Sequence, residues 1–180
     1  MKFKDIPKFT RVAHYKVDIP FDYIKRTIDS YIKEYKLQME PEFQRGHVWT
    51  REQQIAYVEY ILRGGRSGRD IYFNSPTWQS PEVADGGYDE FVLVDGLQRL
   101  TAIMAFLDNK IPVFGYYHDD FEDMNRMPME YFLSFHVNDL KKESEVLTWY
   151  IEMNAGGTPH TKEEIERVRV LLNAVKSKEA

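Results

Sequence analysis

Residues 91–103 read FVLVDGLQRLTAI and join the two elements around which we expect the fold to be built. The apolar run at residues 91–94 predicts a buried strand, because it leaves no polar face for solvent. Leu100 and Ile103 recur at helical spacing and predict a helix directly after the strand. Residues 95–99 separate the two, so the sequence places an acid, an amide and a guanidinium at a strand-to-helix junction.

This junction allows two interpretations. In the first, Asp95 is an ordinary helix N-cap and Arg99 pairs with a surface acid, which local sequence slightly favours because caps are so common. In the second, Gly96 lets the backbone approach an anion at the helix N-terminus, where free N–H groups and the helix dipole favour phosphate. Arg99 would then bind phosphate, and Gln98 would orient a water or a ribose. Asp95 would hold a metal ion, accept from a hydroxyl or fix Arg99.

The rest of the chain predicts a mixed order of helices and strands. Two capping boxes mark helix starts, one at Thr50 with Gln53 and one at Thr161 with Glu164. The order helix, helix, strand, strand, helix, strand, strand, helix, helix is typical of an α+β fold with a small mixed sheet packed with helices. The expected helices span residues 20–37, 50–62, 97–109, 141–153 and 161–177, and the expected strands span residues 70–73, 91–95, 110–117 and 131–137.

Length and composition predict one globular domain over residues 1–180, with a core at about residues 20–137 and a C-terminal helical part at about residues 141–177. The absence of cysteine excludes disulfides, thiolate nucleophiles and cysteine-ligated zinc. No apolar stretch approaches the ~20 residues of a membrane-spanning helix, and the N-terminus lacks a signal-peptide pattern. We therefore expect a soluble, cytoplasmic protein without a membrane partner.

Positive charge is distributed unevenly. The formal net charge of −5 argues against sequence-independent coating of DNA, which depends on neutralising phosphates. Arginines nevertheless cluster between positions 45 and 69, and Arg63, Arg66 and Arg69 could grip backbone phosphates. A solvated face that is simply rich in arginine is an equally good explanation for these three.

Two loops add further polar side chains. Gln44 and Arg45 repeat the Gln–Arg pair in a loop immediately before a helix, and loops often carry function. Residues 154–160, NAGGTPH, lie between the last two helices. A glycine pair in that position is more often a plain helix stop than a phosphate loop.

Three segments together resemble a known family. They are PEFQRGHVW at residues 41–49, VDGLQRLTAI at 94–103 and NAGGTPHTKEEI at 154–165. In order and spacing they are similar to the DGQQR-motif family, the domain-of-unknown-function 262 family of the ParB/sulfiredoxin-like superfamily. This family is related to the N-terminal domain of GmrSD-type modification-dependent restriction enzymes. The similarity covers residues 38 to about 166.

The resemblance implies a ParB/sulfiredoxin-like core with C-terminal helices that binds, and in restriction systems hydrolyses, nucleoside triphosphates (NTPs). An NTP is then the expected ligand or substrate, with Mg²⁺ held at Asp95. Carried over to this sequence, the family motifs assign catalysis to Asp95, Gln98 and Arg99, and phosphate binding to Gln44, Arg45, Gly96, Arg99 and Asn154.

Leu97 departs from the family pattern, which has glutamine at this position. If that glutamine positions an attacking water or contacts the nucleotide, its loss affects hydrolysis even where binding survives. If position 97 faces the core, leucine is a mild change. The nuclease regions of the long family members have no counterpart here, so a separate nuclease or restriction component is an expected partner. A bacterial or phage-infected cell is the setting that this implies.

Three hypotheses follow. The first is a nucleotide-phosphate-binding domain, with or without NTP hydrolysis, linked to DNA restriction, modification or phage–host defence. The second is a DNA-binding or DNA-nicking module that grips DNA through Arg63, Arg66 and Arg69. The third is a non-catalytic regulator or decoy that binds nucleotide or a restriction component without chemistry, and Leu97 is its main support.

Overall fold

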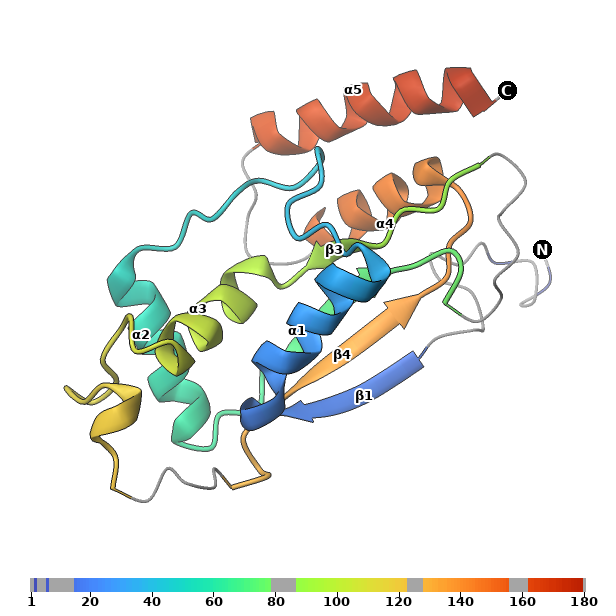
Figure 1. The fold of residues 1–180 in the computed structure, drawn as a ribbon. Helices are drawn as coiled ribbons and strands as arrows, with labels where there is room; N and C mark the ends of the chain where they lie inside the picture. Colours follow the sequence, from blue (N-terminus) through green and yellow to red (C-terminus); the bar gives the residue numbers. More distant parts are fainter. Residues whose placement is uncertain are drawn as a thin grey trace.

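A mixed four-stranded sheet runs through the described part of the chain in the order β1-β4-β2-β3 (Figure 1). The structure is a computed structural model that describes residues 2, 6, 15–78, 87–122, 128–155 and 162–179. β4 pairs antiparallel with β1 and parallel with β2, and β2 pairs antiparallel with β3. The strands are β1 (Tyr15–Pro20), β2 (Asp70–Asn74), β3 (Val92–Asp95) and β4 (Phe132–Asn138).

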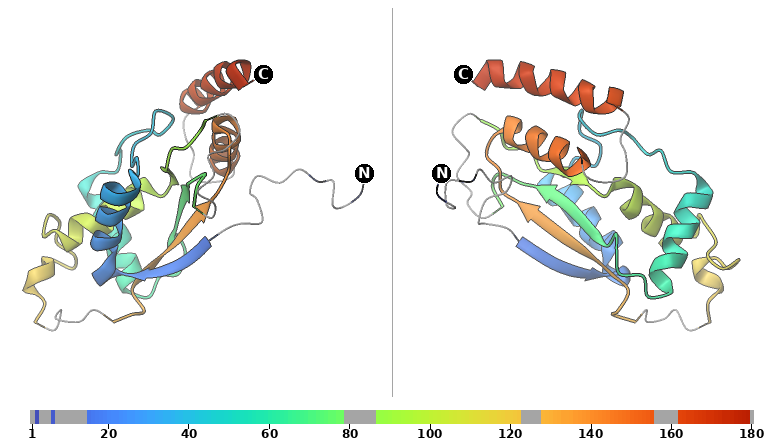
Figure 2. Two further views of the ribbon diagram at one scale, coloured as in Figure 1. Left: turned by 45° about the vertical axis from the view of Figure 1, so that its right-hand side comes forward. Right: turned by 180° about the vertical axis from the view of Figure 1, so that it is seen from behind.

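Helices cover both faces of this sheet (Figures 1 and 2). Three of them pack on one face through the larger of two apolar clusters, and the last two pack on the opposite face through the smaller cluster. In chain order the helices are α1 (Phe21–Tyr35), α2 (Arg51–Leu62), α3 (Leu97–Leu107), the short 3-10 helix η2 (His118–Asp120), α4 (Glu143–Ala155) and α5 (Lys162–Glu179).

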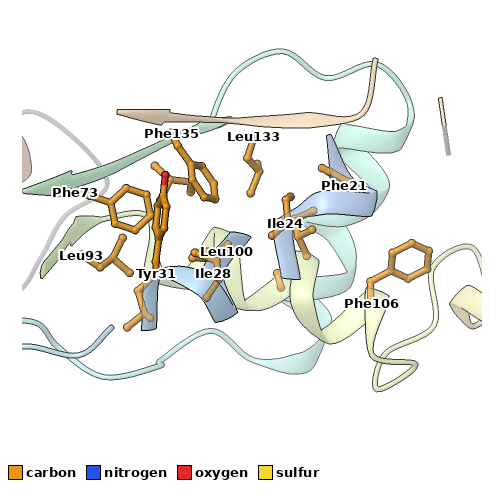
Figure 3. Close-up of a cluster of buried hydrophobic side chains, with 14 of the residues drawn as sticks. Phe21, Ile24, Ile28, Tyr31, Phe73, Leu93, Leu100, Phe106, Leu133 and Phe135 are labelled. Carbon is orange, nitrogen blue, oxygen red and sulfur yellow. The ribbon is translucent and has the colours of Figure 1, made fainter. Parts of the chain in front are cut away.

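The main core lies between the sheet and helices α1 and α3 (Figure 3). Leu133 and Phe135 of β4 point into it, whereas Ser134 between them lies on the other face, as strand alternation requires. From α1, Ile24 and Ile28 meet them at helical spacing. Each such fully buried side chain contributes about 1.5–3 kcal/mol, so this core supplies a rigid base for the loops above it.

β3 is buried on both faces, which explains its uninterrupted apolar sequence. Leu93 belongs to the main core, whereas Val92 and Val94 belong to the second cluster with Val146 and Leu147 of α4. α5 lies on the outer side of α4 (Figure 2). The strand that ends at the polar junction is therefore held from both sides.

The expected α+β class, the five expected helices and the strands at β2, β3 and β4 are confirmed. The first capping box is also present: the Thr50 side chain accepts from the N–H of Gln53, and the Gln53 side chain accepts from the N–H of Thr50. The second, at Thr161, lies outside the described residues. None of the described helices has the length and apolar character that a membrane span requires.

Two expectations about strands were wrong. Residues 110–117 form a tight turn rather than a strand: Val113 and Tyr116 exchange backbone hydrogen bonds, and Phe114 and Gly115 adopt left-handed φ values of 53° and 84°. The β-branched and aromatic residues there suggested a strand, but left-handed residues reverse the chain instead. Strand β1 was not predicted, although Lys16 and Asp18 alternate with apolar residues in it as in a half-buried strand, and its partner β4 is distant in the sequence.

Candidate functional site

The junction between β3 and α3 is built around Gly96. This glycine is the N-cap of α3 and has a φ of 106°. A Cβ at this position would lie 2.6 Å from Cδ1 of Ile71 and 3.3 Å from its Cα, so any other residue would be both strained and crowded. Gly96, and not Asp95, is therefore the N-cap. The first N–H groups of α3 have no acceptor within the helix, as at every helix N-terminus.

Arg99 lies one turn into α3 and binds the carboxylate that precedes the turn. Its Nη2 is 2.5 Å from Oδ2 of Asp95. The side chains of Arg99 and Asp95 are 20% and 34% exposed, so the pair lies at the surface of a cleft rather than in the core. Both partners of this ion pair therefore lie within the junction, and Asp95 fixes the position of the Arg99 guanidinium.

The loop before α2 is held against the end of β3 by Gln44. Its Nε2 donates to the carbonyls of Leu93 and Val94, at 3.0 and 2.8 Å. The next residue, Arg45, forms an ion pair with Glu164 of α5, with 3.4 Å between Nη1 and Oε2. Gln44 therefore positions the loop, and Arg45 projects from it.

Arg167 of α5 fixes the same loop from outside. It donates to the carbonyl oxygens of residues 42, 43 and 44, at 3.0, 3.3 and 3.4 Å. Because the Arg45 partner Glu164 is on this helix as well, α5 holds both the backbone and the charged side chain of the loop.

Gln98 connects α3 to this loop. Its Oε1 accepts from the N–H groups of Val48 and Trp49, at 2.9 and 3.0 Å, and its Nε2 donates to the carbonyl of Gly46 at 3.1 Å. Both ends of the amide are therefore engaged by protein backbone. The adjacent Leu97 is only 4% exposed and packs in the main core, although it also borders the cleft.

All seven residues assigned by the family motifs line one cleft of about 430 Å³, which we call the Arg99 cleft. Three segments distant in sequence meet there: the loop before α2, the β3–α3 junction and the end of α4. Asn154 of α4 donates through Nδ2 to the carbonyl of Tyr150, at 2.7 Å. The cleft is lined by Gln44, Arg45, Trp49, Tyr57, Tyr60, Ser67, Gly68, Asp95, Gly96, Leu97, Gln98, Arg99, Tyr150, Met153 and Asn154.

Two phenols of the cleft, those of Tyr57 and Tyr150, are proton donors rather than bases. Burial raises the pKa of Tyr57 above its usual range and raises that of Tyr150 to about 12. The hydroxyl of Tyr57 donates to the carbonyl of Gly68, at 2.7 Å. Both rings therefore stay neutral at physiological pH, and the charges in the cleft come from its arginines and their carboxylate partners.

The described residues of the cleft do not by themselves supply the ligands of a metal ion. Among the described residues that line it, Asp95 alone bears a carboxylate, and an oxygen of that carboxylate is engaged by Arg99. Across the described ranges, no three His, Cys, Asp or Glu side chains come together in a group that could hold a metal ion. A divalent cation at Asp95 would need further oxygen ligands from outside this set of residues.

A second cleft, of about 780 Å³, lies between the polar side of β1 and β4 and the loop that connects α2 to β2. Lys16, Arg63 and Arg66 line this Lys16 cleft, and their side chains form no ion pair with any other described residue. Two of its three carboxylates have other partners: Asp18 accepts from the hydroxyl of Ser134, and Asp70 binds Nε2 of His136 at 2.6 Å. The third, Glu130, is exposed at the edge of the cleft.

Arg69 differs from the two arginines that precede it. It is buried, donates to the carbonyls of Gly65 and Glu130 at 2.8 Å each, and has its guanidinium carbon 4.8 Å from the centre of the Phe132 ring. Arg69 therefore fixes the loop, whereas Arg63 and Arg66 are exposed.

Sequence reasoning missed Lys16 together with its strand β1, and it missed the part of the Arg99 cleft wall formed by Tyr57, Tyr60, Ser67 and Gly68. The three glycines at positions 64, 65 and 68 were the available signal, since so many in one short loop indicate a close approach of backbone to other groups.

The family model of the GmrSD restriction endonuclease N-terminal domain matches residues 24–131. The matched segment is more than half of the chain and includes the Gln44–Arg45 loop and the Gly96 junction. No curated protein sequence matches the chain significantly. The chain therefore belongs to the family of GmrSD restriction endonuclease N-terminal domains, which links it to DNA restriction and phage defence.

Proposed function

We propose that this domain binds the phosphates of a nucleoside triphosphate in the Arg99 cleft, as the nucleotide-dependent part of a DNA restriction system. The convergence of the Gly96 turn, two arginines and Asn154 on one cleft is the observation that carries the proposal. The helix N-terminus favours an anion, and a guanidinium can bind phosphate through two parallel hydrogen bonds. Cleavage of DNA would belong to a nuclease component that acts with this domain.

Phosphate would replace carboxylate at both arginines. Arg99 would exchange Asp95 for a phosphate oxygen, and Arg45 would exchange Glu164. Because the carboxylates already hold both guanidinium groups in the cleft, little side-chain freedom remains to be lost on binding. A triphosphate offers more charge and more acceptor oxygens than the two carboxylates that it displaces.

The proposal covers binding, and hydrolysis would depend mainly on Asp95. Gln98 uses both ends of its amide to hold the loop, and Leu97 packs in the core, so neither is placed to orient an attacking water. Released from Arg99 by phosphate, Asp95 would be the group that orients water. Release of inorganic phosphate that stops in Asp95→Ala would support hydrolysis; binding without turnover in the unmodified protein would assign the domain a regulatory role.

Thermal unfolding with each of the four common NTPs, with and without Mg²⁺, tests the binding proposal. A ligand that binds only the folded state adds roughly 2.7 kcal/mol of stability at a hundredfold excess over Kd. We expect a rise in Tm for the unmodified protein, loss of that rise in Arg99→Ala and retention in Arg63→Ala, which removes an arginine from the other cleft. Equal rises in both variants would contradict the proposal.

The Lys16 cleft supports a second candidate function, the binding of a nucleic-acid backbone. The specific observation is that three exposed cations of this cleft have no carboxylate partner in the described part of the chain, so that each can neutralise one phosphate. The residues expected to bind DNA change accordingly: Lys16 joins Arg63 and Arg66, whereas Arg69 has a structural position.

Binding of duplex DNA measured over a range of salt concentrations tests this second function. Affinity set by three phosphate contacts falls with salt with a log–log slope of about −2.7. We expect the combined variant Lys16→Ala, Arg63→Ala, Arg66→Ala to lose this salt-dependent binding and Arg99→Ala to keep it. DNA affinity that is unchanged in the triple variant would eliminate the Lys16 cleft as the site.

A further inference from the structure

Aromatic side chains line part of the Arg99 cleft, in addition to the charged residues Arg45, Asp95 and Arg99. Tyr60, near the end of α2, is one of them and is 44% exposed. A large aromatic ring that stays 44% exposed is not packed in the core, so core packing does not account for its position.

The ring of Tyr60 is nevertheless fixed. Its hydroxyl lies 2.6 Å from Oγ of Ser67 and accepts from the N–H of Ser67 at 3.3 Å. The ring also packs closely on Gly65, where an added Cβ would lie 2.4 Å from ring atom Cε1. Held by its helix at one end and by the loop at the other, the exposed ring has little freedom to lose when a flat ligand stacks on it.

A short loop connects this ring to the arginine of the junction. Ser67, which binds the Tyr60 hydroxyl, is followed by Gly68, and a Cβ built on Gly68 would lie 3.8 Å from Cδ of Arg99. Gly68 also accepts the hydroxyl hydrogen bond of Tyr57. Tyr60 and Arg99 thus line one cleft, on the two sides of a loop that Tyr57 fixes in place.

We infer that Tyr60 is the platform on which the base of the bound nucleotide stacks, while the phosphates lie at Gly96 and Arg99. This inference rests on the proposed function and extends it to the nucleoside. Every base has a π-face, and stacking on an aromatic side chain depends little on base identity. The ligand class is therefore a nucleoside triphosphate selected more by its phosphates than by its base, with purines bound more tightly than pyrimidines because their rings are larger.

Calorimetric titration with ATP, GTP, CTP, UTP and inorganic tripolyphosphate tests the inference. The variants are Tyr60→Leu, which removes the ring, and Tyr60→Phe, which keeps the ring and loses both hydrogen bonds to Ser67. Thermal unfolding of each variant checks that it folds. We expect Tyr60→Leu to bind ATP and GTP about tenfold more weakly, as base–aromatic stacking provides, to bind tripolyphosphate unchanged, and Tyr60→Phe to retain most of the nucleotide affinity.

Three results would overturn the inference. If Tyr60→Leu binds ATP as tightly as the unmodified protein does, the base does not stack on Tyr60. Equal losses in Tyr60→Phe and Tyr60→Leu, or a parallel loss of tripolyphosphate binding, would show that Tyr60 acts only by ordering the loop. Absence of binding by both nucleotides and tripolyphosphate in the unmodified protein, or binding that Arg99→Ala leaves intact, would instead refute the proposed phosphate site itself.

Discussion

The Arg99 cleft and the Lys16 cleft share the loop between α2 and β2 as a common wall, yet they hold positive charge in opposite ways. In the first, Arg99 and Arg45 are each paired with a carboxylate. In the second, the cations Lys16, Arg63 and Arg66 have no carboxylate partner among the described residues, and the nearby Asp18 and Asp70 bind other groups. The two clefts therefore suit different kinds of anion.

The Arg99 cleft therefore has the properties of a preorganised binding site, and the Lys16 cleft those of a surface that attracts anions by its charge. Paired arginines at a glycine turn are fixed in position and bind a ligand only by exchanging one anion for another, which favours a compact polyphosphate. Unpaired exposed cations attract any phosphate backbone from solution, and salt screens that attraction.

Gly96→Ala should disrupt the Arg99 cleft most severely. Its Cβ would meet Ile71 in addition to adopting an unfavourable φ, so we expect a loss of roughly 2–5 kcal/mol in the free energy of unfolding. Gly64→Ala in the Lys16 cleft is the matched control, since it has a similar φ of 87° but no atom within 4 Å of the added Cβ. It should lose only about 1–2 kcal/mol.

Urea unfolding measures both losses. Ile71→Val in the Gly96→Ala background removes Cδ1, the nearest atom to the new Cβ, and should restore part of the stability. Similar losses in the two alanine variants would mean that the close approach of Ile71 has no role in building the junction.

Gln98→Leu should loosen the wall of the Arg99 cleft without touching the Lys16 cleft. It removes three hydrogen bonds to the backbone of residues 46–49, and we expect a loss of about 1–3 kcal/mol in stability together with weaker nucleotide binding. Gln54→Leu removes one exposed contact to His47 and serves as control, with an expected effect within about 0.5 kcal/mol. Unchanged stability in Gln98→Leu would leave the loop without the support that we assign to this amide.

Glu164→Gln should make Arg45 resemble the unpaired arginines of the Lys16 cleft. Because the nucleotide would no longer displace this carboxylate, its affinity should rise about two- to fivefold, as the loss of one partly exposed ion pair allows. The dependence of nucleotide binding on salt should also become steeper. Glu163→Gln on the same helix makes the same change of charge at an exposed neighbour, and an equal gain there would reduce the effect to net charge alone.

Local sequence predicted much of the Arg99 cleft. The strand, the glycine turn and the helix lie within residues 91–103, and Asp95 and Arg99 are one helical turn apart, so their pairing needs no distant element. The meeting of this junction with Gln44, Arg45 and Asn154 came from the family resemblance, because no local pattern determines where a loop 50 residues away will pack.

The Lys16 cleft could not be predicted in the same way. Lys16 lies on an edge strand whose register is set by β4, and Arg69 looked like its neighbours Arg63 and Arg66 until the fold placed Gly65 and Glu130 around it. Arg69 is buried and Arg63 and Arg66 are exposed because of tertiary packing, which the sequence of the loop alone does not predict.

The location of the phosphate is the central claim, and backbone amide NMR tests it most directly. Titration of the ¹⁵N-labelled protein with the NTP that gives the largest thermal shift should move the amide signals of residues 96–99 most, as hydrogen bonds form to the first turn of α3. Signals of Lys16, Arg63 and Arg66 should stay in place. Shifts confined to those three residues, with residues 96–99 unchanged, would place the nucleotide in the other cleft and contradict the account.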